Sequence, residues 1–268
     1  MMETILEVSN LTVTLSNGMN IVKDVSFELH SGDVVALVGE NSAGKSTILK
    51  AIVGEEDGDK TVTGSVKFEG EELLSSSGDR KKRRQNFLAK IAYVPQTDNY
   101  HESGHTANVF DVMMQSASSY KDQNSLGKKT IGKNDITALF DRYQLRIFDE
   151  KTKKPLFYEK SCPAKLSGGL QRMLSIISAI AVREHAKLFI IDEPLNNLDF
   201  KNARKVSNLI TRIHKENPDA AILMVTHCKI FPVINRLITI KDGVVVPSEE
   251  KYQCHSCFGK ANAEGYYE

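Results

Sequence analysis

The chain has 268 residues, of which 41% are hydrophobic and 26% are charged, and its formal net charge is +1. This composition is typical of a folded globular protein, and the near-zero charge excludes a global field directed at nucleic acid or another acidic surface. No apolar run approaches the roughly 20 residues of a membrane helix, and the N-terminus lacks a secretory signal. We therefore expect a cytoplasmic protein with reduced cysteines.

The first 53 residues predict strands that lead into a tight turn and a helix. Residues 5–29 contain short segments of strand composition, and Asn17-Gly18 marks a hairpin between them. Val34–Val38 is a continuous apolar run, as is typical of a strand buried on both faces of a parallel sheet. A glycine-rich turn follows, and residues 45–53 then have a helical pattern.

The middle of the chain has a more mixed pattern. Residues 55–90 predict a β-rich and loop-rich insertion with an outer strand at Thr61–Phe68. Within it, Arg80–Arg84 is a basic run of the kind usually found in a solvated loop. Residues 97–166 contain helical patterns at Val109–Ala117 and Asp135–Tyr143, joined by a polar stretch.

Strand and helix alternate from residue 166 onward. The expected order is a helix over 166–182, a strand over 187–191, a helix over 200–215, a strand over 220–225 and a hairpin over 237–246. This alternation favours an α/β fold, in which helices cover a parallel sheet. We expect a core of residues 1–96 and 167–246 and a tail of residues 247–268.

The turn after Val38 has the pattern of a phosphate-binding loop. It reads G-E-N-S-A-G-K-S, matches G-x-x-x-x-G-K-[ST] in full, and lies between a buried strand and a helix. Its glycines allow several backbone N–H groups to point at one anion, to which the helix dipole adds positive potential. The residues predicted to contact phosphate are Gly39, Glu40, Asn41, Ser42, Ala43, Gly44, Lys45, Ser46 and Thr47.

Two adjacent carboxylates, Asp192 and Glu193, follow the apolar strand Leu188–Ile191. Alone, a strand-end Asp-Glu pair more often caps a helix. Beside a phosphate loop, the pair instead predicts hydrolysis, because Asp192 can hold Mg²⁺ together with the Ser46 hydroxyl while Glu193 polarises the attacking water.

A third motif, L-S-G-G-L-Q-R from Leu166 to Arg172, resembles the signature of ATP-binding cassette proteins. The three motifs occur in the order and approximate spacing of that family, over about residues 3–246. Further matches, each weak alone, are Gln96 for the glutamine loop, Asp199 for the D-loop and His227 for the switch histidine.

The resemblance implies a RecA-like P-loop NTPase core with an antiparallel β subdomain and an inserted helical signature subdomain. It also implies that two cassettes pair head to tail, so that each ATP lies between one chain's phosphate loop and the other's Ser167, Gly168 and Gly169. The roles that it implies are catalysis for Glu193, His227 and Gln96, Mg²⁺ binding for Ser46, Gln96 and Asp192, and nucleotide contact for Asp199.

The sequence departs from the family pattern at two positions of interest. Leu15 occupies the place of the aromatic residue that usually stacks on adenine, so we expect weaker base stacking. Leu170 replaces a common glutamine of the signature, and we expect a modest effect because Ser167, Gly168 and Gly169 make the phosphate contacts.

We therefore expect the ATPase subunit of a transporter, peripheral on the inner face of the cell membrane. Its partners would be a transmembrane permease subunit and a second ATPase subunit, with no nucleic acid. An alternative is a cytosolic cassette ATPase that acts on a macromolecule; the sequence lacks the sustained heptads and second phosphate loop common in such proteins. A P-loop kinase is disfavoured by the signature. Cargo, direction, homo- or heterodimerisation, and metal binding by Cys254 and Cys257 stay open.

Overall fold

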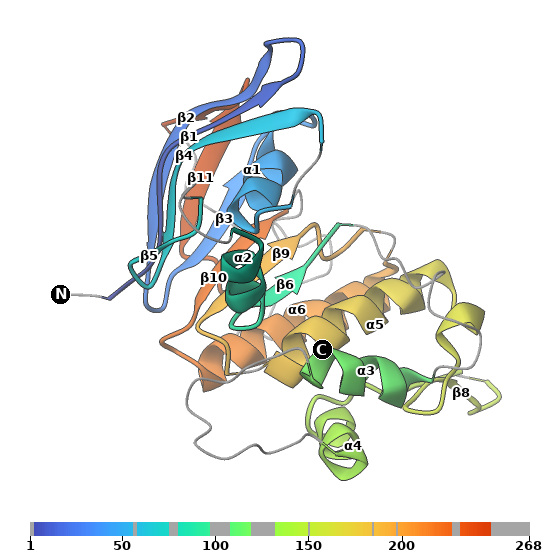
Figure 1. The fold of residues 1–268 in the computed structure, drawn as a ribbon. Coiled ribbons are helices and arrows are strands. Elements are labelled where there is room, and N and C mark those ends of the chain that lie inside the picture. Colours follow the sequence, from blue (N-terminus) through green and yellow to red (C-terminus); the bar gives the residue numbers. More distant parts are fainter. Residues whose placement is uncertain are drawn as a thin grey trace.

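Two larger β-sheets and a layer of helices make up the part of the chain that the structure, a computed structural model, describes (Figure 1). The described residues are 3–55, 58–74, 80–96, 108–118, 132–149, 151–183, 185–196, 198–226 and 231–247. Within them, no helix is long and apolar enough to cross a membrane.

The central sheet has six strands in the order β12-β11-β3-β10-β9-β6. Its inner strands are parallel, and β12 pairs antiparallel with β11 at one edge. The strands are β3 (Val34–Val38), β6 (Ala92–Val94), β9 (Leu188–Asp192), β10 (Ala221–Val225), β11 (Arg236–Lys241) and β12 (Val244–Val246). Because their carboxyl ends lie on one edge of the sheet, the turns that follow β3, β6 and β9 come together there.

The second sheet is antiparallel, in the order β2-β1-β4-β5. Its strands are β1 (Thr4–Leu15), β2 (Asn20–His30), β4 (Lys60–Phe68) and β5 (Glu71–Glu72). The predicted Asn17-Gly18 hairpin is confirmed, since β1 and β2 pair antiparallel on either side of it. β1 is one continuous strand in which Asn10, at φ 52°, accompanies an irregularity of the register.

Helices α5 (Gly168–Ile180) and α6 (Phe200–Glu216) lie along one face of the central sheet (Figure 1). α3 (Val109–Ser118) packs against α5, and α4 (Lys133–Arg142) packs against α3. Short 3₁₀ helices lie at Pro163–Lys165 and Ala181–Arg183. α1 (Lys45–Ile52) lies on the opposite face, where its apolar side chains pack with those of the antiparallel sheet.

The continuous apolar strands are explained by two separate cores. Along β3, Val34 and Ala36 pack into the core beneath the helices, whereas Val35 and Leu37 pack into the core shared with α1 and the antiparallel sheet. All four side chains are fully buried. A strand covered on both faces has no solvent side, so its sequence has no polar alternation.

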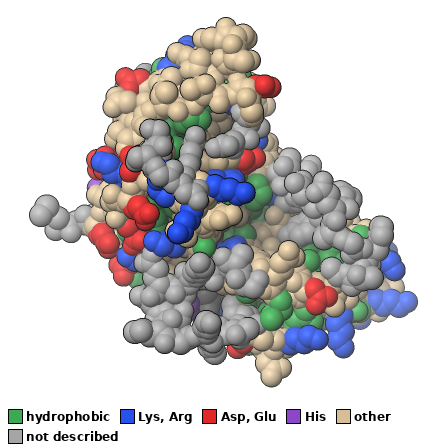
Figure 2. All heavy atoms as spheres, viewed as in Figure 1, with side chains coloured by type: hydrophobic (Ala, Val, Ile, Leu, Met, Phe, Trp, Pro, Cys, Tyr) green, Lys and Arg blue, Asp and Glu red, His purple; other side chains and the backbone are tan. Residues whose placement is uncertain are grey.

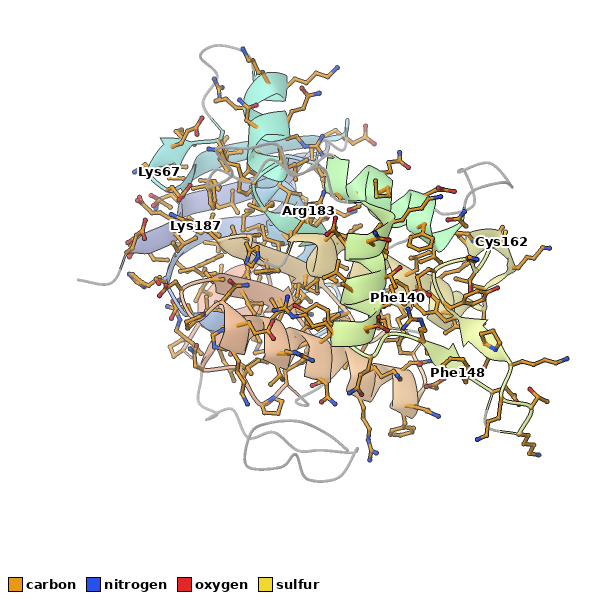
Figure 3. The ribbon with its side chains drawn as sticks, turned by 90° about the horizontal axis from the view of Figure 1, so that it is seen from below. Lys67, Phe140, Phe148, Cys162, Arg183 and Lys187 are labelled. Atoms are coloured by element: carbon orange, nitrogen blue, oxygen red, sulfur yellow. The ribbon has the colours of Figure 1, made fainter. Side chains whose placement is uncertain are left out.

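The helical region contains a small hairpin that the sequence analysis did not predict. β7 (Ile147–Phe148) pairs antiparallel with β8 (Pro155–Phe157). The inward face is apolar: Phe157 is fully buried and its ring centroid lies 5.7 Å from that of Phe140 on α4. Phe148 alternates with buried Ile147 and is 48% exposed at the edge of the molecule (Figure 3).

The prediction of a solvated loop at Arg80–Arg84 is wrong, because these residues begin helix α2 (Arg80–Leu88). Two contacts fix the helix. The Phe87 ring packs 5.2 Å from the Phe68 ring of β4, and Arg84 Nε donates a hydrogen bond to the Val53 carbonyl at 2.9 Å. Lys and Arg side chains gather on the surface over α2 (Figure 2). Tertiary packing of the apolar end therefore overrides the loop-like charge pattern.

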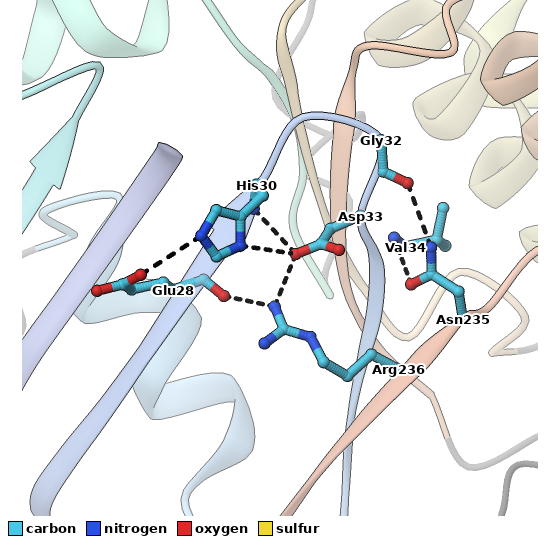
Figure 4. Close-up of polar contacts among 7 residues, drawn as sticks. All are labelled: Glu28, His30, Gly32, Asp33, Val34, Asn235 and Arg236. Carbon is cyan, nitrogen blue, oxygen red and sulfur yellow. Dashed lines mark hydrogen bonds and ion pairs between the residues drawn. The ribbon is translucent and has the colours of Figure 1, made fainter. Parts of the chain in front are cut away.

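The amino end of β3 is fixed to β11 by a polar cluster (Figure 4). The Asn235 side chain accepts a hydrogen bond from Val34 N at 3.0 Å and donates one to the Gly32 carbonyl at 3.2 Å. Asp33 Oδ2 accepts from the Arg236 guanidinium at 2.8 Å and from His30 N at 2.9 Å. The start of the strand therefore has its polar groups paired within the protein.

Candidate active site

A pocket of about 890 Å³ opens at the carboxyl ends of the central strands. Its walls come from the turn after β3, the residues after β6 and β9, the β1–β2 hairpin and the β11–β12 turn. The lining residues are Met19, Asn20, Ile21, Lys23, Asn41, Ser42, Gly44, Lys45, Ser46, Thr47, Gln96, Glu193, Asn196, Asp242 and Gly243. Segments distant in sequence thus meet around one cavity, where ligands of open α/β sheets bind.

The phosphate loop has the conformation that its glycines predict. Gly39 has φ 147°, and a Cβ there would lie 2.1 Å from the Ile240 carbonyl oxygen, so only glycine fits. Gly44, at φ 99°, is the residue from which α1 begins. Ser42 also has a positive φ, of 67°. These left-handed residues curl the backbone around the amino end of α1, where helix N–H groups attract an anion.

Lys45 is held inside this loop. Its side chain is 5% exposed, and its Nζ donates hydrogen bonds to the Gly39 carbonyl at 3.0 Å and the Glu40 carbonyl at 2.7 Å. Burial lowers the pKa of Lys45, while the charges of Glu193 and Asp192 act in the opposite direction. A phosphate bound in the loop would offset the cost of this desolvation, because it would supply a charged hydrogen-bond partner in place of neutral carbonyl groups.

Asp192 is a buried carboxylate beside the loop. It is 1% exposed and accepts a hydrogen bond from Ser46 Oγ at 3.1 Å. Burial raises its pKa to about 6, and the Ser46 hydrogen bond opposes this rise. The oxygens of Ser46 and Asp192 are hard ligands that fit Mg²⁺, which prefers a carboxylate, a hydroxyl and phosphate oxygens.

Glu193 has an unusual backbone conformation and two side-chain partners. Its φ is 46°, the left-handed region that non-glycine residues rarely adopt. Gln96 Nε2 donates to Glu193 Oε2 at 3.4 Å, and Asn196 Nδ2 donates to the same oxygen. The structure therefore brings together Lys45, Ser46, Gln96, Asp192 and Glu193.

Other predicted site residues lie elsewhere. Among the described residues, Ser167, Gly168 and Gly169 do not line this pocket. They form the amino end of α5, where Ser167 and Gly168 are exposed. Asp199 caps α6, since its carboxylate accepts a hydrogen bond from Asn202 N at 2.8 Å. His227 falls outside the described residues, as do Cys254 and Cys257.

The structure does not place Leu15 in the pocket; Met19, four residues later, lines it instead. Met19 is 56% exposed at the β1–β2 hairpin. The hairpin reaches the pocket because the β11–β12 turn packs against it: Lys23 N donates to the Gly243 carbonyl at 2.8 Å, and Gly243 N donates to the Ala43 carbonyl at 3.2 Å. Sequence reasoning found the hairpin but had no signal for this long-range contact.

Comparison with known proteins identifies the family of this chain. The family model described as ABC transporter matches residues 22–196, well over half of the chain. The chain belongs to the ABC transporter family. It is an ATP-binding subunit of this family and an ATPase.

Individual relatives differ in cargo and direction. The chain is 27% identical to the phosphonates import ATP-binding protein PhnC of Fusobacterium nucleatum, over 91% of this chain and 92% of that protein. It is 29% identical to the macrolide export ATP-binding/permease protein MacB of Aggregatibacter actinomycetemcomitans, over 94% of this chain but only 36% of that protein. The dimeric cassette MJ0796 in a post-hydrolysis state bound to ADP and Pi has the same fold, with a TM-score of 0.69 at 22% identity, over 92% and 98% of the two chains.

Proposed function

We propose that this ABC cassette binds Mg²⁺ and ATP in the pocket at the carboxyl end of β3. Two cassettes would close on the nucleotide and thereby drive a separate transmembrane permease. Lys45 and the loop N–H groups would hold the phosphates, and Ser46, Asp192 and Gln96 would hold the Mg²⁺, which neutralises phosphate charge. Glu193 would orient the attacking water and His227 would contact the γ-phosphate. These roles are consistent with the contacts among the described groups.

One observation carries the dimeric part of this proposal. The exposed Ser167 and Gly168 lie at the amino end of α5 and outside the pocket. A Cβ at Gly168 would meet no described atom within 4 Å, so nothing described in this chain requires glycine there. Such a residue suits close approach to a ligand that is held by another molecule. A helix amino end that is exposed and glycine-lined is a second anion cradle.

The partner is proposed to be a second ATPase subunit, with the pair bound to a permease on the inner face of the cell membrane. Named relatives are transporter ATP-binding proteins, which favours this reading over action on a macromolecule. Both half-sites are present in this chain, so a homodimer is sufficient to form complete sites. Because the named relatives include both an import and an export protein, cargo and direction of transport would be set by the permease.

A complementation experiment tests the composite site. Lys45→Ala damages the phosphate loop, and Gly168→Asp places a repelling carboxylate on the signature. Each variant alone forms only damaged sites. A mixed dimer has one damaged and one intact site, because the intact loop of the Gly168→Asp copy faces the intact signature of the Lys45→Ala copy. At equal mixing we expect recovery of about a quarter of wild-type ATPase activity, half of the dimers having one of two sites restored.

The matched control is a mixture of Lys45→Ala with Glu193→Gln. Both changes damage the same half of the site, so neither composite site in the mixed dimer is intact and activity should stay low. Equal activity in the two mixtures, or no recovery in either, would contradict a site shared between two copies of this chain.

A further inference from the structure

Arg172 is the last residue of the signature segment and does not line the pocket. It lies one turn into α5, faces the protein interior and is 3% exposed. Arginine is rarely buried unless acceptor groups compensate its charge, because desolvating a permanent charge is costly. The groups that accept hydrogen bonds from the guanidinium therefore indicate the role of Arg172.

The guanidinium binds three backbone carbonyls at the edge of the active site. One terminal nitrogen, Nη1, donates to the Pro95 carbonyl at 2.6 Å. The other, Nη2, donates to the carbonyls of Asp192 at 2.7 Å and Glu193 at 3.1 Å. A planar guanidinium can span separate acceptors in this way, whereas an ammonium group has a single nitrogen. Arg172 thus joins α5 to the carboxyl ends of β6 and β9.

The residues held in this way carry the side chains of the proposed reaction. Pro95 immediately precedes Gln96, and Gln96 Nε2 donates to Glu193 Oε2 at 3.4 Å. Gln96 and Glu193 line the pocket, whereas Arg172 does not. Arg172 therefore acts on the backbone beneath the pocket, and any effect that it has on hydrolysis passes through Gln96 and Glu193.

Glu193 needs such support because its backbone is strained. At φ 46°, a residue with a side chain persists only when its surroundings determine the conformation. Glu193 N donates to the Val225 carbonyl at 3.0 Å, which fixes one side of the residue. The Arg172 hydrogen bonds to the carbonyls of Asp192 and Glu193 fix the other side.

We propose that Arg172 is a positioning residue, which sets the relative placement of Gln96 and Glu193 and ties it to the signature helix. This inference rests on the proposed function. Because Arg172 and the phosphate-binding Ser167 and Gly168 are on the same rigid helix, a partner that engages α5 also acts on the hydrogen bonds beneath Glu193. The geometry of the water-orienting carboxylate is thereby made dependent on the signature.

The test is Arg172→Lys, which keeps the charge but cannot reach three carbonyls. We expect kcat for ATP hydrolysis to fall about 10- to 100-fold, while the Kd for a fluorescent ATP analogue changes less than about 3-fold, because the phosphate loop is untouched. The matched control is Arg183→Lys. Arg183 (Figure 3) also lies beside α5, but it is less deeply buried than Arg172. It donates hydrogen bonds to Ser116 of α3, and we expect kcat to stay near the wild-type value.

Coupling and local exchange give two further readouts. The kcat losses of Arg172→Lys and Gln96→Ala should combine to less than their product, because both act on the same contact. Amide hydrogen exchange at Glu193 should accelerate while exchange in α1 is unchanged, and this readout does not need hydrolysis. If Arg172→Lys does not fold, Arg172→Gln, a neutral side chain that retains a hydrogen-bond donor, replaces it.

The outcomes separate this inference from the proposed function. Wild-type protein that binds but does not hydrolyse ATP contradicts the proposed function, whatever Arg172 does. Unchanged kcat and unchanged exchange in Arg172→Lys would overturn the positioning role. So would equal losses in nucleotide affinity and kcat, since they would indicate general damage.

Discussion

At its amino end β3 is fixed by polar side chains of the protein itself, whereas its carboxyl end leads into a pocket with strained backbone and buried charge. Asn235, Asp33 and Arg236 pair the polar groups at the amino end (Figure 4). Beyond the carboxyl end lie Lys45, at the start of α1, and Asp192, at the end of β9. Burial lowers the pKa of Lys45 and raises that of Asp192 to about 6.

The difference shows that the two edges of the central sheet serve different purposes. Groups at the amino end are partnered by the protein itself, so they contribute to stability. Groups at the carboxyl end carry charge that burial disfavours and that a bound ligand would compensate, so they are kept at a cost to stability. Substitutions at the two ends are therefore expected to have opposite effects on folding and on activity.

The largest effect is expected from Glu193→Gln at the carboxyl end. The amide keeps the shape of the side chain but cannot accept a proton, so hydrolysis should fall roughly 10²- to 10³-fold. Nucleotide affinity should be retained, because the phosphate loop is unchanged. Steady-state ATPase assays and equilibrium binding would measure the two quantities.

Glu71→Gln is the matched control for this change. Glu71 is exposed on β5 and does not line the pocket. Hydrolysis should stay close to the wild-type rate. An equal loss in both variants would show that overall negative charge, and not the position of Glu193, controls the reaction.

The second prediction concerns the amino end. Asn235→Ala leaves the fully buried Val34 without its hydrogen-bond acceptor, which should lower the free energy of unfolding by about 1–3 kcal/mol. ATPase activity of the folded protein should be retained, because the pocket lies at the opposite end of the strand. Urea unfolding at neutral pH would measure the change.

Asn134→Ala, at an exposed position in α4, provides the comparison for Asn235. Its unfolding free energy should stay within about 0.5 kcal/mol of the wild-type value, as is usual for surface substitutions. Similar destabilisation by both changes would contradict a specific stabilising role for the hydrogen bonds of Asn235.

The third prediction is a stabilising substitution with a defined pH dependence. The Asp192 carboxyl binds its proton more tightly in the folded chain than in the unfolded chain, where its pKa is near 3.8. Its contribution to the stability of the folded state is therefore fully present below about pH 4 and is lost as the pH rises through about 6. Asp192→Asn, measured without Mg²⁺ or nucleotide, should match wild type near pH 4 and be more stable at pH 7, by on the order of 1–2 kcal/mol.

Other groups titrate in the same range, so the difference between the two proteins is the useful quantity. Hydrogen bonds lower the pKa values of Glu72 and Glu216 against the effect of burial, and these groups favour the folded state at higher pH in both proteins. A difference that is constant from pH 4 to 7 would contradict the buried charge at Asp192. The same substitution should abolish hydrolysis, which is the expected conflict between stability and activity.

The sequence predicted the local parts of this comparison well and the long-range parts poorly. The phosphate loop could be predicted because glycine spacing, strand and helix lie within one short segment. In the structure its Ser46 donates a hydrogen bond to Asp192. The helix at Arg80–Leu88 was missed because it depends on the packing of Phe87 against Phe68. The Asn235 network and the support of Glu193 by Arg172 join residues far apart in sequence, for which no local pattern exists.

The smallest expected effect tests one of these long-range contacts. The sequence placed Leu15 at the position that faces the nucleoside base, but Met19 is the hairpin residue that lines the pocket. Met19 offers a flexible thioether, whereas an aromatic ring stacks on a base at little entropic cost. Met19→Tyr should therefore tighten ATP binding about 3- to 10-fold, equivalent to the roughly 0.5–1.5 kcal/mol of an aromatic pair.

Leu15→Tyr distinguishes the two assignments directly. If the packing of the β11–β12 turn against the hairpin sets which residue reaches the base, a ring at position 15 should leave ATP affinity unchanged. Comparison with the binding of inorganic triphosphate separates base contact from phosphate contact, because only ATP should gain from Met19→Tyr. Tighter ATP binding by Leu15→Tyr alone would restore the assignment made from sequence and would mean that the hairpin changes its position when nucleotide binds.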